Sequence, residues 1–409
     1  MAGSHVQKIE KYRKKLQYYL QKDSLVASFI QIDAQGISLF DSEQAKQKRQ
    51  AEFQLSWEKL DDFQRLIRHC PDQAWQIYDT NNWQLLSSFQ DTLAVLTSQL
   101  ALPRKRQLPL AGIRIALDAG HFASNLNEAK IEERFIQMRL PKEKQVVTFF
   151  EAHLTWCTAQ ILKEKLEKQG AIVLLTRPTL EANAKQMWQS WREAKAQLKK
   201  NNLIDTLQAF HTWLINYKKQ DLITRYQKIN NFKPNLTLII HYNVDADNTC
   251  RETPTPKNYN MAFVAGSFLG KELNTKKDRF HLLRLLVSQE IENSIAFAEK
   301  VLQSFEKHLQ VPTIPAETQL DYLKKNCLLT ERQGVYARNL TLCREVLGTL
   351  CYGESLYQDN QEEALALSKR ELEILPNIFT SKRVAQVAEA YYEAILEYIK
   401  ETNKKKLNF

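Results

Sequence analysis

Short apolar runs alternate with longer segments of helical periodicity along the chain after residue 112. Five runs have the length and apolar content typical of strands that are buried on both faces, and they read "IRIAL", "AIVLLT", "LTLIIH", "MAFV" and "GTLCY". Strands separated by helices predict an α/β fold, with a mostly parallel, twisted sheet flanked by helices on both faces. In such a sheet, functional residues gather at the carboxyl ends of the strands.

The N-terminal quarter has a different pattern. Residues 6–22 predict a basic helix, and the runs "VASFIQID" and "GISLFD" predict short strands with Gly36 at the turn. The segment 58–100 is mostly helical by period, and the stretch "ALPRKRQLPLAG" then interrupts the pattern with two prolines, a glycine and a basic cluster. We therefore predict a small mixed accessory domain over residues 1–108 and a larger domain over residues 109–409.

Composition leaves several classes of partner open. The chain has 409 residues, 44% of them hydrophobic, which is enough for more than one globular domain. Its formal charge of +10 is compatible with nucleic acid, an anionic membrane surface or an anionic wall polymer. The six cysteines form no CxxC pair, which argues against a zinc ribbon and a dense disulfide framework.

Neither a membrane span nor a signal peptide is predicted in the sequence as it stands. No run reaches the roughly 18 consecutive apolar residues that a spanning helix needs. The opening residues, Met1 to His5, look like a remnant of expression, so we expect that a targeting segment preceded the chain and was removed.

Three residues at strand ends suggest chemistry. His121 follows "IRIAL" closely, His241 ends "LTLIIH", and Glu354 follows "GTLCYG". A single histidine at a strand end is most often a hydrogen-bonded structural residue. Imidazole and carboxylate are nevertheless the ligands that zinc accepts, and a catalytic zinc site needs three protein ligands and an open position.

The residues around these positions resemble a known family, the zinc-dependent N-acetylmuramoyl-L-alanine amidases of type 3, which cut bacterial peptidoglycan. The resemblance covers roughly residues 112–400. "IALDAGH" is similar to the family's opening strand and first zinc histidine, which places that role on His121. The resemblance implies one Zn²⁺ per chain.

The family's second ligand is a glutamate at the start of the first long helix. Glu151 begins "EAHLTWCTAQILKEKLEKQG", a segment with an apolar stripe and a terminal Gly170 that suits a helix end. The alternative is that Glu151 only interacts favourably with the helix dipole. His153 is a rival ligand, but residues i and i+2 point to different faces of a helix, so we expect it to be structural.

The third ligand and the catalytic carboxylate follow from two further motifs. "RYQKINNFKPNLTLIIHYN" is similar to a family segment that ends in a strand with the third zinc ligand, which places that role on His241, although isoleucine replaces the usual serine at position 239. "CYGESLYQDNQEEALAL" is similar to the segment that carries the catalytic glutamate, which places that role on Glu354. The closing helix "SKRVAQVAEAYYEAILEYI" also resembles the family's ending.

Three further residues are weaker substrate-binding candidates: Asn243, Arg338 and Asn360. For the two asparagines, a local role at a strand end or a helix cap is the stronger interpretation. Arg177 and Arg225 are expected to brace the sheet edge by pairing with carboxylates.

The resemblance implies hydrolysis of the amide bond between N-acetylmuramic acid and L-alanine of the stem peptide by zinc-activated water. Glu354 would accept the water proton and return it to the departing amine. Peptidoglycan or muropeptides would be the substrate, and the protein would act in the periplasm or cell envelope.

The chain departs from the family directly after the first histidine. Phe122 and Ala123 stand where the family has two glycines, and the loop from there to Glu151 is long. This loop contains "EERF", residues 132–135, whose charges could line the cleft; we expect them to lie at the surface instead.

Two expansions also distinguish the chain, a helical insertion over about 180–221 and a second over about 245–335. Both adjoin strand ends. One of them could be an autoinhibitory element, with a regulatory protein as partner, or a helical cap that shapes a substrate groove.

The alternative function is a catalytically silent amidase-like module that binds the cell wall or, given its basic charge, nucleic acid. The presence of all four polar residues of the predicted site argues against silence. No specific nucleic-acid motif occurs, and lysine-rich stretches such as "NKKKLNF" are more simply solvated surface or contacts to an anionic polymer.

Overall fold

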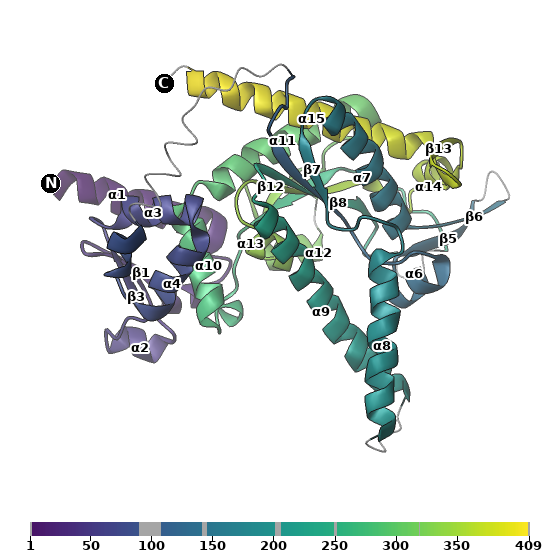
Figure 1. The fold of residues 1–409 in the computed structure, drawn as a ribbon. Coiled ribbons are helices and arrows are strands. Elements are labelled where there is room, and N and C mark those ends of the chain that lie inside the picture. Colours follow the sequence, from purple (N-terminus) through teal and green to yellow (C-terminus); the bar gives the residue numbers. More distant parts are fainter. Residues whose placement is uncertain are drawn as a thin grey trace. The chain divides into compact units, whose positions relative to one another are not determined.

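The computed structural model describes residues 2–89, 108–140, 145–200, 206–248, 252–318 and 320–407 (Figure 1). The chain forms two compact units. The first unit comprises Met1–Arg106, Phe263–Ile295 and Glu317–Gly348, and the second comprises Gln107–Ala262, Ala296–Ala316 and Thr349–Phe409. The boundary near residue 106 lies close to the predicted one at 108. Two later segments, which we had placed in the larger domain, cluster with the N-terminal part instead.

The first unit is built around a small antiparallel sheet, in the order β1-β2-β3. The helix α10 (Lys276–Val287) belongs to this unit because it packs on α1, α3 and α4. Much of the predicted expansion over 245–335 therefore belongs to the first unit, together with the N-terminal segment. The other helices and strands of the unit are α1 (Ala2–Lys15), η1 (Leu16–Leu20), η2 (Ser24–Phe29), β1 (Ile30–Ile32), β2 (Gly36–Leu39), α2 (Glu43–Gln47), β3 (Phe53–Ser56), α3 (Leu60–His69), α4 (Pro71–Thr80), η3 (Gly270–Glu272), α12 (Asp321–Asn326), β10 (Cys327–Leu329), β11 (Val335–Arg338) and α13 (Thr341–Glu345).

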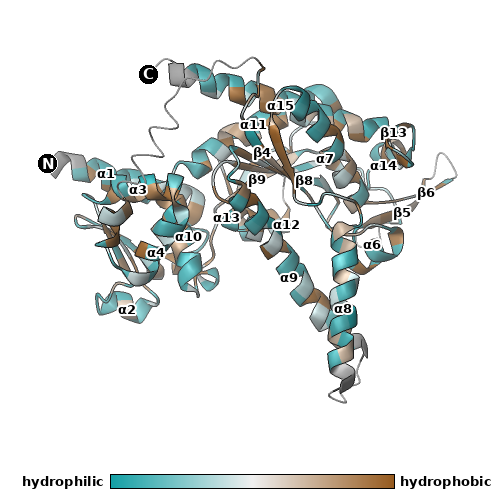
Figure 2. Ribbon diagram, in the orientation of Figure 1, coloured by the Kyte–Doolittle hydropathy of each residue, from teal (hydrophilic) through white to brown (hydrophobic). Residues whose placement is uncertain are grey.

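The five predicted strands after residue 112 all form, and they lie in one sheet of order β10-β11-β9-β12-β8-β4-β7. They are β4 (Arg114–Ala119), β7 (Ile172–Leu175), β8 (Leu236–Asn243), β9 (Met261–Val264) and β12 (Leu350–Tyr357). The pairs β12–β8, β8–β4 and β4–β7 are parallel. The predicted α/β fold with a mostly parallel sheet is confirmed. All eight residues of β8 are buried. Figure 2 shows hydrophobic residues, in brown, among the strands of the sheet.

Helices cover both faces of these parallel strands. On one face, Thr158 of α7 (Glu151–Lys168) shares a hydrogen bond with Tyr242 of β8. On the other, Arg225 of α9 (Thr206–Phe232) pairs with Asp118 of β4. The helix α15 (Lys382–Leu407) packs along α7, and α11 (Glu290–Leu309) and α14 (Gln361–Ser368) contact α15.

The long loop between β4 and α7 is structured. It forms the helix α6 (Leu126–Glu132) and an antiparallel hairpin of β5 (Phe135–Leu140) and β6 (Gln145–Phe150). A second hairpin, of β13 (Leu372–Leu375) and β14 (Ile378–Thr380), precedes α15. The predicted insertion over 180–221 is helical in α8 (Ala182–Lys200) and the first part of α9. Within the described ranges, no helix is long and apolar enough to cross a membrane.

Candidate metal centre

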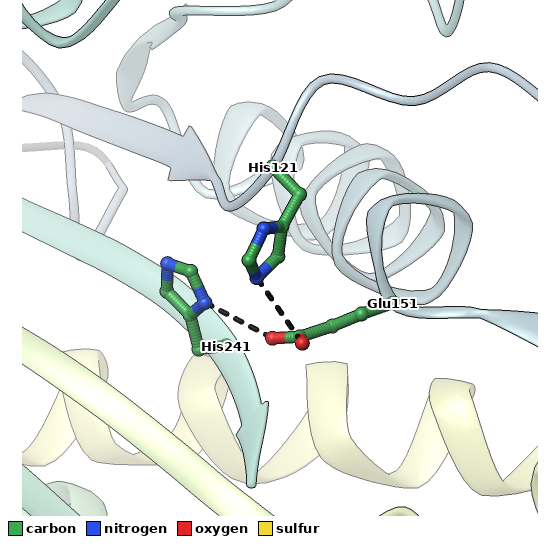
Figure 3. A group of neighbouring side chains, drawn as sticks. All are labelled: His121, Glu151 and His241. Carbon is green, nitrogen blue, oxygen red and sulfur yellow. Dashed lines mark hydrogen bonds and ion pairs between the residues drawn. The ribbon is translucent and has the colours of Figure 1, made fainter. Parts of the chain in front are cut away.

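The three predicted metal ligands meet at the carboxyl end of the parallel sheet (Figure 3). His121 follows β4, His241 lies near the end of β8, and Glu151 is the first residue of α7. One ligand atom from each residue lies within 4.8 Å of the others. They come together because β4 and β8 are adjacent parallel strands, with Ala119 paired to Ile240, so both strands end at the same edge.

The Glu151 carboxylate lies between the two rings, and each oxygen faces one histidine. Oε1 is 3.0 Å from Nδ1 of His241, and Oε2 is 3.1 Å from Nε2 of His121. Each oxygen also accepts a second hydrogen bond, Oε1 from the Tyr242 N–H and Oε2 from the Gln358 amide, both at 3.1 Å. No sequence signal singled out Gln358, because its contact with Glu151 joins residues more than 200 positions apart.

The backbone of His121 is fixed by two buried arginines. Its φ of 67° is in the left-handed region, which non-glycine residues seldom adopt. Its carbonyl accepts from Arg225 at 2.6 Å and from Arg177 at 3.2 Å. Arg225 pairs with the carboxylates of Asp118 and Asp221, as expected. For Arg177 the expectation was wrong: it donates to the backbone carbonyls of His121 and Ala152.

Glu132 contacts the far side of the His121 ring. Its Oε1 lies 2.9 Å from Nδ1 of His121, and the carboxylate also accepts the backbone N–H groups of Phe122 and Ala123. Glu132 is 7% exposed, so the expectation that "EERF" lies at the surface is wrong for this residue. Glu132 is the last residue of α6, and its carboxylate points toward His121 and the loop after it.

The charges in the cluster suit a cation. Burial alone would raise the pKa of Glu151, but the charge of His121 and hydrogen bonds from both histidines outweigh burial and hold that pKa well below its usual range. Burial lowers the pKa of His121, but Glu151 and Glu132 outweigh it and raise the pKa to about 9. Burial lowers the pKa of His241, which favours its neutral form.

The donor set fits zinc. Two imidazole nitrogens and one carboxylate are common ligands of catalytic zinc. One ligand atom from each of the three residues lies within 4.8 Å of the others, so the three side chains could hold one ion between them.

Glu354 is the direct neighbour of His241 on the adjacent strand. The two residues are partners in the parallel pair of β12 and β8, which places their Cα atoms about 4.8 Å apart. Two residues earlier on β12, the ring of Tyr352 stacks on that of His241, with centroids 4.6 Å apart and 7° between the planes. Tyr352 therefore restricts the orientation of this ring, a role that the sequence did not indicate.

The weaker candidates differ in their surroundings. Asn360 caps α14, because its side chain accepts from Glu362 and Glu363 and donates to the Thr255 and Lys257 carbonyls. The guanidinium of Arg338 lies in the first unit over the rings of Phe263 and Tyr322. Neither arrangement presents a free side chain to a substrate.

Asn243 and His153 flank the cluster in sequence. Asn243 is 8% exposed, its oxygen accepts the Val244 N–H, and its side-chain nitrogen has no acceptor among the described residues. His153 contacts the Cys157 sulfur at 3.6 Å, and burial with two nearby arginines lowers its pKa to about 4. It does not join the metal-ligand cluster.

Comparisons with known proteins give matches at the level of structure alone. No family model and no curated protein matches the sequence. Structural neighbours are N-acetylmuramoyl-L-alanine amidases, the family that the sequence resembles. The CwlD amidase of Clostridioides difficile, solved in complex with the GerS lipoprotein, is 16% identical, with 71% of this chain and 99% of that chain covered and a TM-score of 0.40.

Two further neighbours are similar in extent. Ami1 of Mycobacterium abscessus is 13% identical, with the same coverage of 71% and 99% and a TM-score of 0.38. AmiC2 of Nostoc punctiforme is 14% identical, again with 71% and 99% covered, and has a TM-score of 0.36. At such scores we draw no conclusion about function from the likeness.

Proposed function

We propose that the protein is a zinc-dependent N-acetylmuramoyl-L-alanine amidase, which hydrolyses the amide bond between N-acetylmuramic acid and L-alanine of peptidoglycan in the cell envelope. One observation carries the proposal: His121, Glu151 and His241, predicted as ligands from separate motifs, lie within 4.8 Å of one another at the end of the sheet. Hydrogen bonds hold each of them in place, as a preformed metal site requires.

The residues around the cluster divide the chemistry among them. Zinc, when bound, supplies Lewis acidity that polarises an amide carbonyl and lowers the pKa of water. Glu354, next to His241 on the adjoining strand, is the candidate general base that accepts the proton of the attacking water and passes it to the departing amine. A carboxylate can perform both transfers, because it is a base before the attack and an acid after it.

Asn243 is a candidate for substrate orientation. Its side-chain N–H₂ is buried and has no acceptor in the described part of the chain, and a buried donor without an acceptor is costly. A carbonyl oxygen of the stem peptide would satisfy it. Asn360 and Arg338 are not included in the proposal, because both are engaged elsewhere.

The test is digestion of purified peptidoglycan, with mass spectrometry of the released products. We expect free stem peptides that begin at L-alanine, and about one zinc per chain in the purified protein. Products cut between sugars or within the stem peptide would refute the amidase assignment, and so would a protein that binds no zinc.

Glu354→Gln separates chemistry from metal binding. The variant keeps the size of the side chain but removes its basicity, so it should retain zinc and lose cleavage by at least about 100-fold. His121→Ala is the matched control, since it should bind zinc much more weakly than wild type and lose activity as well. Full cleavage by Glu354→Gln would remove this residue from the mechanism.

A further inference from the structure

Glu132 contacts the ring nitrogen of His121 that faces away from the other ligands. Nε2 of His121 lies beside Glu151, while Nδ1 lies 2.9 Å from Oε1 of Glu132. We propose that Glu132 is a positioning residue of the metal site: it accepts the Nδ1–H of His121 and so keeps the Nε2 lone pair directed at the ion. This inference rests on the zinc site of the proposed function.

The Glu132 carboxylate is itself held in place. It accepts the N–H groups of Phe122 and Ala123, each at 3.2 Å, so backbone donors of the loop after His121 orient it. Directly after it, Glu133 adopts a left-handed conformation with φ of 60° and ends α6. The side chain thus enters the site from a defined helix end, and one carboxylate fixes both the ring of His121 and the loop that follows.

This arrangement has a known physical effect on metal ligands. A carboxylate that is hydrogen-bonded to the nitrogen not bound to the metal selects the tautomer of the histidine, orients its ring and makes the metal-binding nitrogen more basic. Loss of such a partner typically weakens metal binding by about 10–100-fold. Removal of the Glu132 charge therefore weakens zinc binding.

The same helix provides a matched control. Glu128, one turn earlier on α6, is 6% exposed, and Glu132 is 7% exposed. Glu128 also holds the loop after His121 in place, because it accepts hydrogen bonds from the N–H and the hydroxyl of Ser124. It accepts a further hydrogen bond from the Trp188 indole at 2.7 Å. It is not hydrogen-bonded to any of the three ligands. Glu128→Gln therefore reproduces the loss of a buried, loop-bracing charge without a direct effect on His121.

The experiment compares the zinc affinities of wild type, Glu132→Gln and Glu128→Gln by competition with a chromophoric chelator, with metal-free thermal unfolding as the measure of fold. We expect Glu132→Gln to bind zinc about 10–100-fold more weakly, and Glu128→Gln to stay within about twofold of wild type. Equal zinc affinity of Glu132→Gln and wild type would overturn the inference, and so would equal weakening by both variants.

A double-mutant cycle tests whether Glu132 acts through His121. In a His121→Ala background, Glu132→Gln should change the residual zinc affinity by less than about twofold, because the group that it positions is absent. The same loss in both backgrounds would overturn the inference. A wild-type protein that binds no zinc would refute the proposed function itself, whereas normal zinc binding by Glu132→Gln would refute this inference alone.

Discussion

Gly120→Ala should impair the metal site through a single methyl group. Gly120 lies between β4 and His121, and the ring of His241 lies over its Cα. A Cβ at this position would be 2.5 Å from Nε2 and 2.7 Å from Nδ1 of His241, where ordinary van der Waals contact begins at 3.4 Å. Cε1 of the ring would lie closer still, so the ring must move by more than about 0.9 Å to restore normal contact.

That displacement is large for a metal site, where ligand distances are held within about 0.2 Å. If zinc binding is worth about 10–16 kcal/mol over four positions, one ligand contributes roughly 3 kcal/mol, and its loss corresponds to about 100-fold in affinity. The crowding itself should reduce the free energy of unfolding by about 1–3 kcal/mol. Chelator competition measures the first effect, and thermal unfolding of the metal-free protein measures the second.

Gly353→Ala is the matched control, because it crowds the opposite face of the same sheet. Its Cβ would lie 3.0 Å from Cζ of Tyr391 on α15. We expect a similar loss of stability, by about 1–3 kcal/mol, with zinc affinity unchanged. A folded Gly120→Ala protein with wild-type zinc affinity would refute the reasoning, and so would an equal loss of zinc affinity in both variants.

Two further predictions concern pH and the helical insertion. Burial lowers the pKa of His153 from 6.5 to about 4, so the unfolded chain binds this proton more tightly than the folded chain does. The free energy of unfolding should therefore fall by up to about 3 kcal/mol as the pH drops from 6.5 to 4. Denaturant titrations of the metal-free His153→Gln variant should show a smaller fall than those of the metal-free wild type. Trp191 and Trp213 face each other near the end of the α8–α9 hairpin, 5.2 Å apart, so replacing residues 192–212 by a short glycine linker should leave zinc and fold intact. If the hairpin shapes a substrate groove, this variant should cleave polymer more slowly and small muropeptides at the wild-type rate; faster cleavage of both would instead indicate autoinhibition.

The hairpin truncation keeps the base of the insertion for a structural reason. Asp221 of α9 pairs with Arg225 at 2.7 Å, and Asn183 of α8 donates to Asp221. Arg225 in turn holds the carbonyl of His121. Deletion of the whole insertion over 180–221 would therefore disturb the metal site directly, and a change in rate could not be assigned to substrate access.

Local patterns along the chain predict several parts of this protein. Buried strands need continuous apolar runs, so β4, β7, β8, β9 and β12 were predictable from the chain. The resemblance to the amidase motifs placed the ligand roles on His121, Glu151 and His241, and the structure brings these three residues together. The parallel order of the strands then required His121 and His241 to lie at one edge of the sheet.

The residues that support these ligands follow from tertiary packing and not from local pattern. Glu132, Gln358 and Tyr352 contact them from other elements, and each depends on distances between segments that no local period records. The division into units has the same origin, because α10 joins the N-terminal part through packing against α3 and α4. The strands form because of residues that are neighbours along the chain. The burial of the Glu132 carboxylate against the His121 ring depends instead on how the completed helices and strands pack.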